Sequence, residues 1–192
     1  MKTIRFIDCG ANIGQSIEWA QKTFYGYNLK IDSFEPLPLN IEVLNEKYLS
    51  QENITIHPKA ISTTNSTQRF YCQNWGARTG SSLIEGKSSA TDGYIDVETV
   101  DLAEWLNLNI NKDEIAILKI DIEGSEYKVL PHLFENKIHE WIDTWLVEFH
   151  PSTKVSTFNS EVINQTKTNV KWLADWALDF TDANNIIKNI IK

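Results

Sequence analysis

The sequence predicts a doubly wound α/β fold with a mostly parallel sheet and an antiparallel insertion at its edge. Short apolar segments alternate with helical patterns along most of the chain. A glycine-containing loop joins the first apolar segment to the first helical pattern, and residues 62–101 form a β-rich stretch. Because 192 residues can bury a sizeable core, we expect residues 1–192 to form one domain.

The first part of the chain predicts three strands and two helices in alternation. The strands are expected at residues 4–8, 30–34 and 54–61, where the segments are short and apolar, as buried parallel strands are. The helices are expected at residues 15–24 and from about residue 40, where apolar residues recur at helical spacing. This order of elements is typical of a parallel sheet covered by helices.

The β-rich stretch predicts a pair of strands. These strands are expected at residues 68–72 and 94–100, and a loop rich in glycine and serine, residues 76–82, lies between them. We therefore expect an antiparallel insertion on the edge of the main sheet.

The alternating pattern returns after residue 101. A short helix is expected at residues 101–106, followed at residues 115–121 by the most apolar strand of the chain. A helix should begin at residue 126 and break at Pro131, because proline lacks the N–H group and clashes with the preceding turn. The last core strand is expected at residues 145–149.

The tail, residues 152–192, is expected to be helical, with at most a brief strand near residues 178–181. It ends in an apolar stripe at helical spacing that is too apolar to stay exposed. We expect this stripe to dock on the sheet or to form a dimer contact, so the protein is expected to be a monomer or a homodimer. The stripe consists of Ala183, Ile186, Ile187, Ile190 and Ile191.

The composition argues against several classes of partner. The net charge of -8 disfavours nonspecific nucleic-acid binding, which needs clustered Lys and Arg. No apolar run approaches the length of a membrane span, and no signal peptide is recognised. We therefore expect a cytoplasmic protein that binds neither nucleic acid nor a membrane. Cys9 and Cys72 are expected to be reduced core thiols.

The loop from Asp8 to Gly14 is a candidate ligand site. Gly10 permits a tight turn and the close approach of a ligand, and Gly14 lets the next helix pack near the strand. The N–H groups and the helix dipole favour an anionic or carboxylate ligand. The pattern is related to the dinucleotide-binding loop, with Asn12 in place of one glycine. A tight turn without a ligand explains the same residues, so the loop alone leaves both interpretations open.

Glu35 favours the ligand-binding interpretation. It lies 21 residues after Gly14, at the end of the second predicted strand. A carboxylate at this position accepts hydrogen bonds from both hydroxyls of a ribose in related loops. The alternative is a solvated acid in a loop.

A second cluster of polar residues lies at the carboxyl ends of the later strands, the edge where open α/β sheets carry their ligand crevice. Asp121 and Glu123 follow the strand at residues 115–121 and are candidates for substrate binding, for a general base or for a metal site. Glu126 has two interpretations of equal weight. It is either a catalytic acid or an acid that stabilises the N-terminus of a helix through the helix dipole. His150 is a candidate general base, with a structural role as the alternative.

With these motifs in place, the chain resembles the FkbM-type methyltransferases, a branch of the class I enzymes that use S-adenosylmethionine. The resemblance covers about residues 4–150, and the matching pieces occur in the order of the family. They are Asp8-Cys9-Gly10-Ala11-Asn12-Ile13-Gly14, Phe34-Glu35-Pro36, Ser81-Ser82-Leu83, Val100-Asp101, the run from Leu118 to Glu126, and Glu148.

The resemblance implies a Rossmann-like fold and methylation of a hydroxyl on a sugar or a small natural product, with S-adenosylmethionine as the cofactor. The implied partner is thus a small-molecule or glycan hydroxyl acceptor. The implied contacts are Asp8, Gly10, Asn12 and Gly14 on the methionine part, Glu35 with the adjacent Pro36 on the ribose, Ala60 and Ile61 on the adenine, and Asp121 and Glu123 beside the methyl group.

The mechanism that follows is mainly positioning of donor and acceptor in line. Asp121 or His150 is expected to act as the base for a hydroxyl acceptor. A divalent metal held by Asp121 and Glu123 is a second possibility, but no metal site is predicted. Asp121, Glu123 and His150 are therefore the predicted catalytic residues.

Two other classes of function share parts of this pattern. A nicotinamide-dependent oxidoreductase has a similar glycine loop and acid, but it does not account for the acids after residue 120. A non-catalytic binding module that retains the fold is the other alternative. Two departures from the family bear on it: Pro131-His132 follows Val129-Leu130 where a glycine is usual, and the tail lacks the usual strand hairpin.

Overall fold

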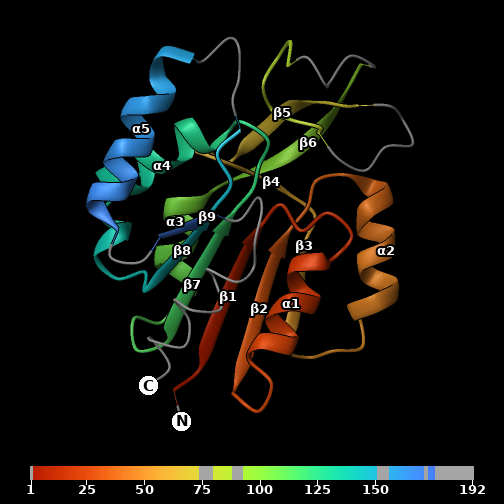
Figure 1. Cartoon of the computed structure of the whole chain (residues 1–192). Coiled ribbons are helices and arrows are strands. Elements are labelled where there is room, and N and C mark those ends of the chain that lie inside the picture. The colour runs from red at the N-terminus through yellow and green to blue at the C-terminus, as the bar shows by residue number, and fades with distance from the viewer. Residues whose placement is uncertain (1, 74–79, 88–92, 151–155, 171–172, 176–192) are drawn as a thin grey trace.

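A parallel six-stranded sheet forms the centre of the computed structural model, in the order β3-β2-β1-β7-β8-β9 (Figure 1). The structure describes residues 2–73, 80–87, 93–150, 156–170 and 173–175. All neighbouring strands of this sheet run parallel. The strands are β1 (Ile4–Cys9), β2 (Leu29–Phe34), β3 (Ile54–His57), β7 (Ile115–Ile120), β8 (Thr144–Val147) and β9 (Leu173–Asp175).

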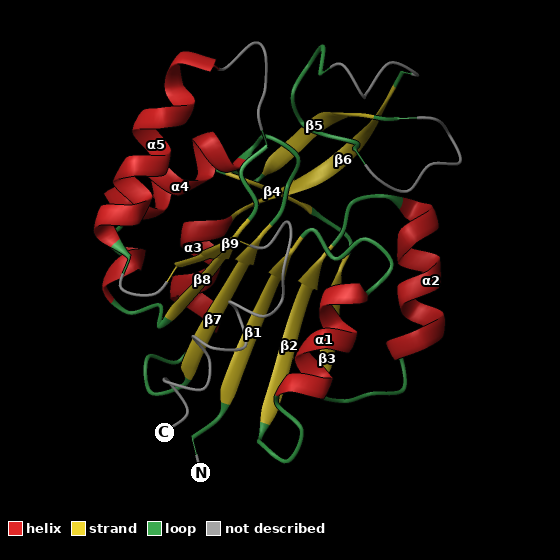
Figure 2. Cartoon of the chain, in the orientation of Figure 1, coloured by secondary structure: helices red, strands yellow, loops and turns green. Residues whose placement is uncertain are grey.

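Helices cover both faces of the sheet, which confirms the predicted α/β fold class (Figure 2). On one face lie α1 (Gln15–Thr23) and α2 (Pro38–Tyr48). On the other face lie α3 (Leu102–Asn109), α4 (Glu126–Glu135), the 3-10 helix η1 (Ile138–Glu140) and α5 (Ser156–Asn169). Pro38 begins α2 two residues earlier than expected, since proline is favoured in the first turn of a helix.

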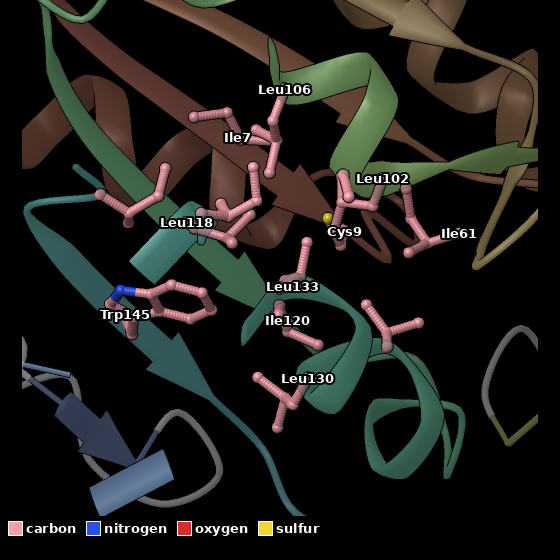
Figure 3. Packing of buried hydrophobic residues seen from close by; sticks show 14 of the residues in the cluster. Ile7, Cys9, Ile61, Leu102, Leu106, Leu118, Ile120, Leu130, Leu133 and Trp145 are labelled. Atoms are coloured by element: carbon pink, nitrogen blue, oxygen red, sulfur yellow. The ribbon is translucent and has the colours of Figure 1, made fainter. Parts of the chain in front are cut away.

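The two faces of the strands pack against different helices, because successive strand side chains point to opposite sides. Ile7 and Cys9 of β1 and Leu118 of β7 pack with α3 and α4, together with the fully buried Trp145 of β8 (Figure 3). Phe6, Ile31, Ile117 and Leu146 face the opposite way and pack with α1 and α2. Both cysteines are buried and in the thiol form, as expected.

The β-rich stretch forms a second sheet of its own. In this sheet β6 (Tyr94–Asp101) lies between β4 (Ala60–Ser62), which is parallel to it, and β5 (Ser66–Tyr71), which is antiparallel. The predicted antiparallel pair is therefore present. It forms a small sheet of its own beside the main one.

The expected strand at residues 54–61 is two strands in two sheets. β3 pairs with β2 as far as His57, and the chain then turns at Pro58, where Lys59 N donates to His57 O at 2.8 Å. Proline has no N–H group to continue the ladder, so the chain leaves the main sheet here and β4 begins the smaller one.

The expected break of a helix at Pro131 does not occur, since α4 continues through it to Glu135. Proline removes one helical hydrogen bond, but the helix buries Val129, Leu130, Leu133 and Phe134 in the core. Packing of this apolar face outweighs the missing hydrogen bond.

The tail is not wholly helical. After α5 the chain adds β9, which pairs in parallel with β8. A strand of three residues is too short to show a period in the sequence. The expected strand near residues 178–181 and the apolar stripe after residue 182 lie outside the described residues. In the part of the chain that the structure describes, no helix is long and apolar enough to cross a membrane.

Candidate functional site

A pocket opens at the carboxyl ends of β1, β2 and β7. Here the chain order reverses, because β2 and β7 lie on opposite sides of β1, and such switch points hold ligands in open α/β sheets. Among the described residues its lining includes these predicted site residues: Gly10, Asn12, Glu35, Pro36, Ala60, Ile61, Asp121 and Glu123. Asp8, Gly14 and His150 are not part of that lining.

Gly10 is required by both the backbone conformation and the space around it. Its φ is +95°, and a Cβ atom there would lie 1.9 Å from the carbonyl oxygen of Asp121. Gly10 N and Ala11 N both donate to Phe34 O, at 3.0 Å each. The loop is thus held against the ends of both β2 and β7.

Gly14 closes the same loop at the start of α1. Its φ is +98°, and an added Cβ atom would lie 2.7 Å from the ring of Tyr48 in α2. The Tyr48 hydroxyl donates to Gly14 O at 3.2 Å. Gly14 therefore permits close packing of α1 against α2, whereas the sequence had predicted close packing of the helix against the strand.

Asp8 lies beneath the loop and is fully buried. Its Oδ2 accepts hydrogen bonds from Ser16 Oγ at 2.5 Å and from Ser33 Oγ at 3.2 Å, while Oδ1 lies 3.2 Å from Lys119 Nζ. These contacts join β1, α1, β2 and β7 directly under the pocket.

Lys119 links this buried acid to the pocket. Its ammonium donates to Gly10 O at 2.6 Å and lies 3.2 Å from both Asp8 Oδ1 and Asp121 Oδ2. Although burial alone would lower the pKa of Lys119, the charges of Asp8 and Asp121 raise it above its usual value. Lys119 is therefore a buried cation that fixes the positions of the loop and of Asp121.

Glu35 is buried at the end of β2 and faces the pocket. Its Oε2 accepts a hydrogen bond from Asn12 N and its Oε1 accepts one from Leu37 N, each at 2.9 Å. Burial raises the pKa of Glu35 to about 7, although these hydrogen bonds act in the opposite direction. Glu35 also has a side-chain hydrogen bond with Asn40. Glu35 thus shapes the glycine loop and forms part of the pocket lining.

The raised pKa predicts a pH dependence of stability. Between the ordinary value of 4.5 and about 7, the folded state holds a proton on Glu35 that the unfolded state has lost. The free energy of unfolding should therefore fall as pH rises from 5 to 8, by up to about 3 kcal/mol more in the wild type than in Glu35→Gln. Urea unfolding of both proteins across this range measures the difference, and parallel curves would contradict the expectation.

Asp121 and Glu123, which line this pocket, lie close to His150. His150 Nε2 lies 3.8 Å from Asp121 Oδ1, 3.5 Å from Glu123 Oε2 and 3.3 Å from Glu148 Oε1. One ligand atom from each of Asp121, Glu123 and His150 lies within 4.8 Å of the others, so this group has the spacing to hold a metal ion.

The protonation of this cluster reflects its crowded charges. Burial lowers the pKa of His150, but the nearby carboxylates, Glu126 first, raise it above its usual value overall. Burial and the charge of Asp121 raise the pKa of Glu148. The negative charges of this cluster therefore favour the protonated forms of His150 and Glu148.

Glu123 has partners that the sequence did not indicate. Its carboxylate accepts a hydrogen bond from Gly80 N at 3.1 Å and pairs with Lys87. Ser82 Oγ donates to Glu123 O at 2.7 Å. The Ser81-Ser82-Leu83 motif pointed to this loop, but no pattern linked Lys87 to an acid 36 residues away. Glu123 thus anchors residues 80–87 over the pocket.

The part of the pocket near Ala60 and Ile61 is mostly apolar. Phe34, Leu37, Phe70 and Leu83 contribute to the same lining. An apolar wall of this kind suits a flat aromatic group that stacks or packs between side chains.

Comparison with known proteins places this fold and pocket in a family. The family model described as Methyltransferase FkbM domain matches residues 8–173, which span the pocket and both sheets. The chain therefore belongs to the FkbM methyltransferase domain family.

The crystal structure of methyltransferase FkbM from Methylobacillus flagellatus KT is similar in fold. The TM-score is 0.52 at 18% sequence identity, and the match covers 84% of this chain but only 37% of that one. The chain thus spans well under half the length of that protein. No curated protein matches the chain.

Proposed function

We propose that the protein is an S-adenosylmethionine-dependent methyltransferase that methylates a hydroxyl on a sugar or small natural product. The observation that carries this proposal is the pocket at the switch point, where the glycine loop, Glu35 and Asp121 meet. Membership in the FkbM family supports it. The same membership disfavours the nicotinamide-dependent oxidoreductase.

The residues present fit S-adenosylmethionine. Gly10 and Asn12 would lie against its methionine part, while Asp8 and Gly14 support the loop from behind. Glu35 already accepts two backbone N–H groups and a hydrogen bond from Asn40. A carboxylate has about four acceptor positions, so one is left for a ribose hydroxyl. Pro36, Ala60 and Ile61 would line the ribose and adenine end.

When bound, the cofactor supplies a methyl group on a sulfonium sulfur, which becomes a neutral thioether as the methyl carbon bonds to the acceptor oxygen. The protein must hold the acceptor in line and remove its proton. Lys119 occupies Asp121 Oδ2, so Asp121 Oδ1 and His150 Nε2 are the atoms that would take this proton. Glu123 would act by holding residues 80–87 in place.

A base is a better assignment than a metal ion here. Lys119 pairs with Asp121 and Lys87 pairs with Glu123, so both carboxylates already have a positive partner. A divalent ion would have to compete with these ammonium groups. We therefore propose that methyl transfer proceeds without a metal.

A transfer assay tests this function. Labelled S-adenosylmethionine is incubated with a panel of sugars and small hydroxyl compounds, with and without EDTA. Wild-type protein should methylate at least one acceptor, with EDTA having no effect. Asp121→Ala should reduce turnover by about 100-fold or more. The control is Asp113→Ala, which changes an exposed acid.

Two outcomes would contradict the proposal. Full activity of Asp121→Ala would show that Asp121 is neither base nor positioning group. Cofactor binding without transfer to any acceptor would favour the non-catalytic module instead.

A further inference from the structure

Glu126 is a fully buried carboxylate that joins the two loops carrying the acid cluster. It is the first residue of α4, directly after the loop that follows β7. Its Oε2 accepts a hydrogen bond from Gly124 N at 2.8 Å, and its Oε1 accepts one from His150 N at 2.7 Å. One side chain therefore connects the loop after β7 to the segment after β8.

The same carboxylate faces the ring of His150. Glu126 Oε1 lies 3.3 Å from Nδ1, while Nε2 faces Asp121, Glu123 and Glu148. In a neutral imidazole one nitrogen carries the proton and the other is an acceptor. A buried carboxylate beside Nδ1 favours the proton on that nitrogen.

We propose that Glu126 is a positioning residue that holds His150 as the Nδ1–H tautomer, so that Nε2, on the side of Asp121 and Glu123, stays free to accept a proton. This inference rests on the proposed function, in which Nε2 takes the proton of the acceptor hydroxyl. His150 then becomes an imidazolium, and the buried Glu126 carboxylate stabilises that charge. Glu126 is not itself part of the pocket lining, so in this role it acts through His150.

The electrostatics agree with this arrangement. Among the described residues, the carboxylates facing His150 are Glu126 from α4, Asp121 and Glu123 from the loop after β7, and Glu148 after β8. Asp121 and Glu123 are also paired with lysines. Glu126 is fully buried, and no lysine of the described part of the chain forms an ion pair with it. It is therefore the acid whose charge acts on His150 most directly.

Nuclear magnetic resonance of protein with isotope-labelled histidine tests the proposal without any cofactor. The His150 signals are assigned with His150→Gln. In the wild type at high pH, neutral His150 should show the Nδ1–H tautomer. In Glu126→Gln the pKa of His150 should fall by about one unit, because a nearby opposite charge is lost.

The matched control is Glu135→Gln, which removes an exposed acid at the other end of the same helix and should leave the pKa of His150 unchanged. An Nε2–H tautomer in the wild type would overturn the proposal even if Glu126→Gln failed to fold. An unchanged pKa in folded Glu126→Gln would overturn it as well. Because no cofactor is present, these results are independent of whether S-adenosylmethionine binds.

Discussion

Gly10→Ala is expected to destabilise the protein strongly and to abolish binding of S-adenosylhomocysteine. An L-residue at φ +95° is strained, and the new Cβ atom would lie 1.9 Å from the backbone oxygen of Asp121. To relieve this clash, the ends of β1 and β7 would have to move apart. The pocket lies at these ends and would be distorted. We expect a loss of about 3 kcal/mol or more in the free energy of unfolding, measured with urea.

Gly26→Ala is the matched control for this change. Gly26 has a similar φ of +87°, but nothing lies within 4 Å of an added Cβ atom. It should cost only the conformational penalty of about 1–2 kcal/mol. If both variants lost the same stability and both bound the ligand, the close approach of Gly10 to Asp121 would not matter.

Lys119→Met is expected to have the second large effect. Its removal leaves Asp8 buried without its cation, frees Asp121 Oδ2 and deprives Gly10 O of its donor. Removing one member of a buried ion pair typically costs about 3–5 kcal/mol, because the remaining charge stays out of water. Urea unfolding measures this cost.

The control for Lys119→Met is Lys30→Met, which alters an exposed lysine in the neighbouring strand β2. It should change stability by less than about 0.5 kcal/mol. An equal loss in both variants would mean that the buried contacts of Lys119 contribute nothing to stability.

The sequence predicted those helices and strands in which buried side chains recur at a clear period. The strands at the centre of the sheet and helix α1 match the expected bounds within a residue or two, because their buried positions recur at the period of the element. The errors occur where tertiary contacts decide. Pro58 separates two strands, Pro131 is tolerated inside α4, and β9 is too short to be recognised.

In the candidate site, too, some features could be predicted from the sequence and others could not. Gly10, Asn12 and Glu35 could be predicted because a strand-to-helix loop and the acid after the next strand are close in space whenever the sheet is parallel. The contacts of Lys87 with Glu123 and of Lys119 with Asp8 join distant segments. Such pairs depend on side-chain packing across the fold, and a single sequence carries no periodic signal for them.

Calorimetric titration with S-adenosylhomocysteine, and separately with NAD, tests the central claim most directly. We expect micromolar binding of S-adenosylhomocysteine, no binding of NAD, and loss of binding in folded Glu35→Ala, because Glu35 shapes the loop and faces the ribose end of the pocket. Binding of NAD alone would favour an oxidoreductase. Failure of the well-folded protein to bind either ligand would contradict the account and would favour a non-catalytic module.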